Sequence, residues 1–160
     1  MRDGQLRVYT TNNWKMIYHK KISKEWIEDL KFSPDGKYLC IGSHDNKLYL
    51  YSVPDFKRKV FGKSSSFITH IDWSQDGSAI RTNDGSYEIL YYTIPDGTQD
   101  TSGASNFRNE LWTTQSNVLG WAMQGVWQPC QDGSDINHAD RSIGPLNNGQ
   151  EIVATANDDG

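Results

Sequence analysis

The 160-residue chain has few of the features that mark secreted, membrane or disordered proteins. Two cysteines, Cys40 and Cys130, cannot form a disulfide framework, and no Asn-x-Ser/Thr sequon occurs. Five prolines and 12% aromatic residues do not fit a disordered chain. The opening segment MRDGQLRVY lacks the apolar run of a signal peptide. We therefore expect a folded protein in a reducing, intracellular compartment.

Long hydrophobic runs and sustained helical periodicity are also missing. The uncharged stretch 111–131 carries eight Thr, Gln, Ser and Asn side chains. A membrane-spanning helix needs about 20 mainly apolar residues, so this stretch does not qualify. No window keeps the 3.6-residue period of an amphipathic helix. We expect no membrane association and very little helix.

Charge is distributed unevenly, although the net charge is only −4. Residues 1–63 contain 13 Lys and Arg against 7 Asp and Glu, whereas residues 64–160 contain 3 against 13. The bulk charge argues against a nucleic-acid partner, but the first part favours an acidic one. The alternative is that these lysines only solvate turns and block pairing at strand edges.

A repeat with a period near 40 runs along the sequence. The segment FSPDGKYLCIGSHDNKLYLYSV at 32–53 matches WSQDGSAIRTNDGSYEILYYTI at 73–94. Its first aromatic residue and its first Asp-Gly pair both recur 41 residues later. We match the second turn, Asp45-Asn46, to Asp84-Gly85, 39 residues later. Residues 3–10 match 45–52 at a distance of 42.

Each unit is predicted to contain four short strands. Residues 27–32 alternate apolar and polar side chains with a break at Glu28-Asp29, and Asp-Gly pairs supply tight turns. Further strands are expected at 38–42, 48–51 and 56–61. Four strands in about 40–45 residues are typical of a β-propeller blade. The fold class is therefore all-β, with antiparallel blades in an incomplete ring of about three.

The repeat resembles the WD-repeat. The shared pattern is an aromatic residue, Ser-x-Asp-Gly, a strand of small residues, an Asp turn and a strand that ends on aromatic residues. Tyr51-Ser52 and Tyr92-Thr93 stand where the family usually has Trp-Asp, and the usual Gly-His pair is absent. We predict Asp45, Asp84 and Asp159 to be structural turn residues that accept backbone N–H groups.

The third unit is irregular and narrows the resemblance. Trp127 is matched to Phe32 and Trp73, with about 19 residues inserted before Asp159. The run SSFITHIDWSQDGSAIRTNDGSYEILYY, followed by VLGW, GVW, DGSDIN and VATANDDG, resembles the echinoderm microtubule-associated protein-like family. In that family a similar stretch lies in the second of two tandem propellers.

We divide the chain into the end of one blade, two whole blades and the start of a fourth, at 3–25, 26–63, 64–114 with a long loop, and 118–160 with an inserted loop. A propeller needs about 4–8 blades to close, so we expect a fragment. Uncovered sheet faces and edges should make an isolated monomer prone to aggregate.

No residue pattern indicates catalysis, a cofactor or a metal. His70 and Asp72 share one face of a strand, where we interpret them as flanking residues. Asp132–Asn137 with Asp140 resembles a calcium loop in composition but lacks its spacing, so a self-bonded loop is expected. No nucleophile elbow or phosphate-binding loop is present. Four tryptophans are predicted to lie on strands and to pack between blades: Trp26, Trp73, Trp121 and Trp127.

These features favour a non-catalytic, protein-binding scaffold. The family resemblance implies tubulin or microtubules as partner and a cytoplasmic, cytoskeletal location, with no small-molecule substrate. Candidate contacts to an acidic partner are Lys20, Lys21, Lys57, Arg58 and Lys59. Two alternatives stay open: a propeller domain of a larger enzyme such as a peptidase, and a WD-repeat scaffold unrelated to microtubules.

Overall fold

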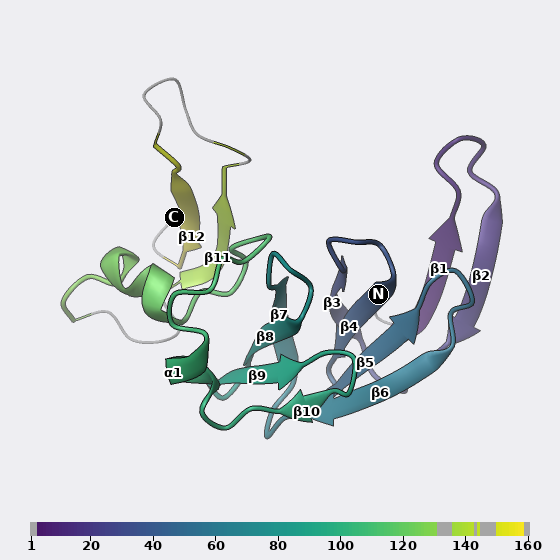
Figure 1. The fold of residues 1–160 in the computed structure, drawn as a ribbon, viewed down its shortest axis with the longest axis horizontal. Coiled ribbons are helices and arrows are strands. Elements are labelled where there is room, and N and C mark those ends of the chain that lie inside the picture. Colours follow the sequence, from purple (N-terminus) through teal and green to yellow (C-terminus); the bar gives the residue numbers. More distant parts are fainter. Residues whose placement is uncertain (1–2, 131–135, 143, 145–149, 159–160) are drawn as a thin grey trace.

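Four antiparallel sheets form an open arc in the computed structural model, which describes residues 3–130, 136–142, 144 and 150–158 (Figure 1). The outer pairs are β1 (Gln5–Tyr9) with β2 (Met16–Lys21), and β11 (Ile136–Arg141) with β12 (Val153–Asn157). The first four-stranded sheet contains β3 (Ile27–Phe32), β4 (Tyr38–Ser43), β5 (Lys47–Ser52) and β6 (Arg58–Lys63). The second contains β7 (Ile68–Trp73), β8 (Ala79–Asp84), β9 (Ile89–Thr93) and β10 (Thr98–Gln99).

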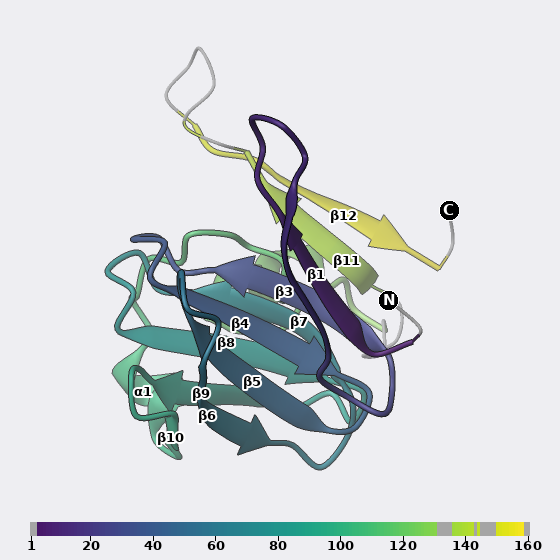
Figure 2. The ribbon, with the colours of Figure 1, turned by 90° about the vertical axis from the view of Figure 1, so that its right-hand side faces the viewer.

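Helix is confined to two short pieces within the described residues, α1 (Gly103–Asn106) and the 3₁₀ turn η1 (Trp121–Val126). The predicted all-β, antiparallel class with few helices is confirmed. Consecutive strands neighbour one another within each four-stranded sheet, in the orders β3-β4-β5-β6 and β7-β8-β9-β10. The first strands, β3 and β7, lie on the inner side of the arc, and the last strands, β6 and β10, on its outer side (Figure 1). The β11–β12 pair stands on the inner side, away from β9 and β10 (Figures 1 and 2).

The central strands of the first sheet are apolar throughout because both of their faces are covered. Successive side chains of a strand point to opposite faces. Leu48 and Leu50 of β5 join one core, between the two four-stranded sheets, with Cys40 of β4 and Ile68, Ile71, Trp73, Ile80 and Tyr92. Tyr49 and Tyr51, at the alternate positions, join a second core that lies toward β1, with Leu6, Ile27, Leu39, Ile41 and Phe56. One strand therefore serves two inter-sheet contacts.

Gly42 sets how closely the two four-stranded sheets approach. A Cβ atom at this position would lie 2.5 Å from Cγ2 of Ile68 on the neighbouring sheet. Such a distance is far inside van der Waals contact, so only a residue without a side chain fits here. The glycine in the middle of the YLCIGS strand is thus explained by packing and not by a turn.

The repeat is visible in the backbone itself. A register shift falls at the same place in β3, β7 and β11, between Ile27 and Asp29, Ile68 and His70, and Ile136 and His138. The first of these confirms the predicted break in strand 27–32. Positive φ angles also recur 41 residues apart, at Asn46 (63°) and Tyr87 (61°).

The register corrects the match of the second turn. Ser43 and Asp84 are the equivalent residues, because they pair with Ile27 and Ile68 at the starts of β3 and β7. Asp45 is therefore equivalent to Ser86, and the match of Asp45-Asn46 to Asp84-Gly85 was wrong by two residues. The similar Asp-Asn and Asp-Gly pairs favour that match, but strand pairing, not turn composition, fixes equivalence.

The irregular unit also differs from the prediction. Phe32 and Trp73 end the first strands of their sheets and pair with Leu39 and Ile80. The residue at this place in the last sheet is Arg141, which pairs with Val153. Trp127, which was matched to these positions, follows η1 and lies before β11. Most of the extra chain therefore precedes β11, and Asp159 lies outside the described residues.

Only one of the four tryptophans predicted to lie on strands does so. Trp73 ends β7, is 1% exposed, and donates its indole N–H to the carbonyl of Lys31 on the neighbouring sheet. Trp26 precedes β3 and is 41% exposed, Trp121 belongs to η1, and Trp127 follows it. The prediction failed there because an aromatic residue in a loop has the same sequence appearance as one in a strand.

Candidate functional site

The loops at the start of the inner strands gather on one face. They are residues 22–26, 44–46, 64–67 and 85–88, and we call this the loop face. Hydrogen bonds join the loops of neighbouring sheets: Ser64 N–H donates to the carbonyl of Asn46 (2.9 Å), and the Asn46 amide donates to the carbonyl of Ser65 (3.2 Å). Loops fixed in this way give a rigid surface.

A row of rings crosses the loop face from one sheet to the next. The His44 ring stacks on Phe67, with centroids 4.5 Å apart, and lies 5.1 Å from the ring of Trp26. His44 Nε2 is 2.9 Å from a carboxylate oxygen of Glu28, which orients the imidazole. Exposed aromatic rings with a polar neighbour are common at protein–protein interfaces.

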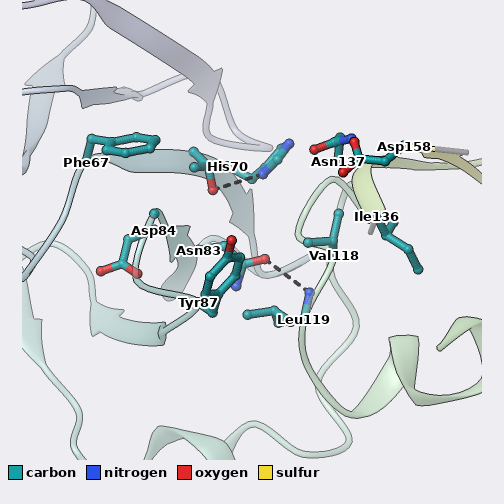
Figure 3. A pocket seen from close by; sticks show the side chains of 12 residues that line it. Phe67, His70, Asn83, Asp84, Tyr87, Val118, Leu119, Ile136, Asn137 and Asp158 are labelled. Atoms are coloured by element: carbon teal, nitrogen blue, oxygen red, sulfur yellow. Dashed lines mark hydrogen bonds between the residues drawn. The ribbon is translucent and has the colours of Figure 1, made fainter. Parts of the chain in front are cut away.

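A groove of about 300 Å³ opens between the second four-stranded sheet and β11 (Figure 3). The Phe67 and Tyr87 rings stand at its edge, and Val118, Leu119 and Ile136 line its apolar side. The backbone N–H of Leu119 donates to Oδ1 of Asn83 (3.1 Å), which ties segment 118–119 to β8. We call this the central groove.

Two histidines meet beside the central groove. His70 Nε2 lies 3.1 Å from His138 Nδ1, and these residues occupy the same position after the register shifts of β7 and β11. Burial, followed by the charge of His138, lowers the pKa of His70. A neutral His70 can share a proton with His138 in a hydrogen bond, whereas two protonated rings would repel. His70 and Asp72 thus have roles in packing between sheets.

The predicted turn aspartates hold their own loops. Asp45 Oδ1 accepts the backbone N–H of Lys47 (3.2 Å). Asp84 Oδ1 accepts the N–H groups of Ser86 and Glu88, each at 3.0 Å, and its other oxygen accepts the hydroxyl of Ser64 from the preceding loop. Asp159 lies outside the described residues.

Asp72 is the most heavily bonded carboxylate among the described residues, and the sequence did not single it out for this role. It is fully buried. Oδ1 accepts the hydroxyl of Thr114 (2.6 Å) and both the hydroxyl and N–H of Ser116 (2.9 Å each). Oδ2 accepts both the backbone and the side-chain N–H of Asn117 (3.1 and 2.8 Å). These bonds pin the irregular segment 114–117 to β7.

Arg81 completes this buried network. Its Nε and terminal nitrogen donate to Asp72 Oδ2 at 3.1 and 2.9 Å, and its guanidinium lies 4.5 Å from the centre of the Trp112 ring. Burial alone would raise the pKa of Asp72, but Arg81 and the other donors hold it below its ordinary value. A signal was present in the sequence, since pairing across the Asp76-Gly77 turn puts Asp72 opposite Arg81.

A larger groove of about 940 Å³ runs along the loop face beside the first four-stranded sheet. It is lined by the segment from Lys21 to Glu25, the turn from His44 to Lys47, and the side chains of Tyr49 and Arg58. We call it the basic groove. Of the predicted contact residues, Lys21 and Arg58 lie in it together, whereas Lys20, Lys57 and Lys59 are exposed and do not line it.

Neither groove has the chemistry of a metal or membrane site in the part of the chain that the structure describes. No three His, Cys, Asp or Glu side chains are close enough together there to hold a metal ion. Cys40 is buried, and burial raises the pKa of its thiol, so the reactive thiolate is disfavoured. The described helices are all too short to cross a bilayer. Residues 131–135 of the calcium-like loop lie outside the described residues.

The sheet order, the inner first strands and the 41-residue repeat define a part of a WD-repeat β-propeller. A family model described as the second β-propeller of echinoderm microtubule-associated protein matches residues 1–160. The chain belongs to this family, as the sequence resemblance indicated.

Relatives of known name agree. The chain is 45% identical over 98% of its length to echinoderm microtubule-associated protein-like 2 of Homo sapiens, and covers 24% of it. It is 39% identical over 99% of its length to echinoderm microtubule-associated protein-like 3 of Homo sapiens, covering 18%. A ciliary WD repeat-containing protein, ctxp80 of Euplotoides octocarinatus, is 42% identical over 86% of the chain, which covers 19% of it. The chain thus spans about a fifth of these relatives.

Proposed function

We propose that this chain is part of a non-catalytic scaffold that binds microtubules in the cytoskeleton. Two relatives are named as microtubule-associated protein-like and a third as ciliary. The observation that carries the proposal is membership of a microtubule-associated propeller family, together with the cations of the basic groove on the loop face. A surface of this kind suits an acidic protein partner, and the tubulin surface is acidic.

The contacts predicted from the sequence keep their place in this proposal. Lys21 and Arg58 would meet the partner through the basic groove. Lys20, Lys57 and Lys59 would add long-range attraction from the surrounding surface, because exposed charges steer association without fixed contacts. None of the relatives named above is described as a peptidase, so we do not develop the enzyme-domain alternative.

Co-sedimentation with microtubules tests the proposal. We expect the full product of the gene that encodes this chain to pellet with taxol-stabilised microtubules at low ionic strength. The bound fraction should fall as salt is raised from about 0.05 to 0.2 M, because screening shortens the range of surface charges. Absence of pelleting at low salt would contradict the proposal. Pelleting that does not respond to salt would contradict the role given to the lysines.

A further inference from the structure

The basic groove carries more positive charge than its own carboxylates neutralise. Four of its residues are cationic, Lys21, Lys24, Lys47 and Arg58, and two are acidic, Glu25 and Asp45. Lys47 Nζ lies 3.9 Å from Asp45 Oδ2. Among the described residues, neither Lys21, Lys24 nor Arg58 has an ion-pair partner within 4.0 Å. Three cations therefore face the groove without a carboxylate of the chain.

The carboxylate of Asp45 is held within the wall of the groove. Its Oδ2 accepts the phenolic hydroxyl of Tyr49 at 2.5 Å, and its Oδ1 accepts the backbone N–H of Lys47. Burial, and then this hydrogen bond, raise the pKa of Tyr49, so the phenol remains a donor. Asp45 thus serves the turn, and the excess of positive charge stays available to a partner.

The walls of the groove are fixed before any partner arrives. The N–H groups of Ile22 and Ser23 donate to the carbonyl of Gly4, at 2.9 and 3.2 Å. The buried Ser23 hydroxyl accepts the N–H of Glu25 (3.0 Å) and the hydroxyl of Ser43 (2.8 Å). Because this backbone is already ordered, binding would cost little conformational entropy.

The groove is also too large for one side chain. Its volume of about 940 Å³ is about three times that of the central groove. The cations come from three places along it, namely the end of β2, the turn before β5 and the start of β6. Charges spaced along a groove match charges spaced along an extended chain.

We propose that the basic groove binds an extended segment of a partner protein that is rich in glutamate and aspartate. This inference deepens the proposed function and rests on it, since it names the kind of segment through which an acidic partner is held. Lys21, Lys24 and Arg58 would pair with its carboxylates at the rim of the groove. Lys57 and Lys59 would contribute only general attraction, because they do not line the groove.

A labelled oligoglutamate peptide provides the test, with fluorescence anisotropy as the measurement and the 160-residue chain as the receptor. The groove variant is K21E/R58E, and the matched control is K57E/K59E. Each reverses two exposed cations, so both change the net charge equally. We expect the groove variant to lose about 10-fold in affinity and the control less than about 2-fold, because specific pairs count for more than distant charges.

Several outcomes would overturn the inference. These are no binding of the peptide by the unmodified chain, equal losses in both variants, or equally tight binding of a single-stranded oligonucleotide, which would indicate a general polyanion surface. If circular dichroism shows that the groove variant is misfolded, K24E in the exposed loop takes its place and must weaken binding. Microtubule pelleting without peptide binding would reject the groove alone. Peptide binding without pelleting would reject the proposed function alone.

Discussion

The two seams on either side of the second four-stranded sheet are built from different chemistry. The seam with the first sheet is apolar, with Leu48, Leu50, Ile68, Ile71 and Trp73 in one core. Across the other seam lies a smaller apolar cluster of Val118, Met123, Ile136 and Ala139. There, the buried Asp72–Arg81 pair instead pins the segment before β11.

This difference shows what holds a repeat together when its sequence becomes irregular. Between regular units, alternating apolar residues on adjacent strands suffice, and stability comes from burial. Where the chain enters the irregular unit, five backbone and side-chain donors of residues 114–117 converge on one carboxylate. A buried charge is tolerated only when it is paired and fully hydrogen-bonded, so this seam should respond sharply to single changes.

The largest effect is expected from Asp72→Ala. The change removes the carboxylate and leaves the Arg81 guanidinium buried without its partner. Loss of one member of a buried pair costs about 3–5 kcal/mol, which is much of the stability of a typical domain. Urea denaturation followed by tryptophan fluorescence measures the change.

A double variant sharpens this result. In Asp72→Leu with Arg81→Met, no charge is left uncompensated, so it should be more stable than Asp72→Ala. If both variants lose the same free energy of unfolding, the pair is not the feature that stabilises this seam. A loss below about 1 kcal/mol in Asp72→Ala would show that the polar seam is dispensable.

The apolar seam should give an intermediate effect. Gly42→Ala places a methyl group against Ile68 and is expected to cost about 1–3 kcal/mol, as in other overpacked cores. Gly125→Ala is the matched control, since an added Cβ there meets no atom within 4 Å. Thermal unfolding of both variants checks this. Equal melting temperatures would contradict the close approach of the two sheets.

The smallest effect concerns the two histidines of the polar seam. Because the pKa of His70 is lowered on folding, the unfolded chain takes up the proton first as pH falls. Stability should therefore decrease as the pH drops below the ordinary value of 6.5 and through the lower pKa of folded His70. Groups that act on His70 are His138, Asp29, Asp72 and Lys31, and the first of these opposes protonation most.

His70→Gln should flatten this pH dependence, since glutamine does not titrate. Denaturation midpoints of both proteins between about pH 5 and 8 provide the measurement, across the range where histidine titrates. An unchanged pH profile in the variant would show that His70 is not the group responsible. Asp72 titrates at lower pH and so does not interfere in this range.

The regular part of the fold could be predicted from sequence because its signals are local. Asp76-Gly77 and the apolar strand after it indicate a hairpin, and the same signals return at a fixed distance. The place of β11 could not be found in this way, since Arg141 stands where the earlier units have Phe32 and Trp73. Aromatic matching selected Trp127, whereas strand pairing selects a charged residue.

The candidate site was only partly predictable for a related reason. Charge asymmetry pointed to residues 20–21 and 57–59, but sequence does not tell which of them share a groove. Lys21 and Arg58 come together there because β2 packs beside the first four-stranded sheet, a contact between segments far apart in the chain. The aromatic row of Trp26, His44 and Phe67 likewise joins two sheets.

Hydrogen–deuterium exchange of the full gene product, alone and on microtubules, tests the central claim most directly. If this chain is a microtubule-binding surface, backbone amides of residues 20–25, 44–49 and 57–63 should exchange more slowly in the complex. Amides in the loop 74–78, at the opposite end of the sheets, should not change. Full binding with no protection anywhere in these 160 residues would contradict the account.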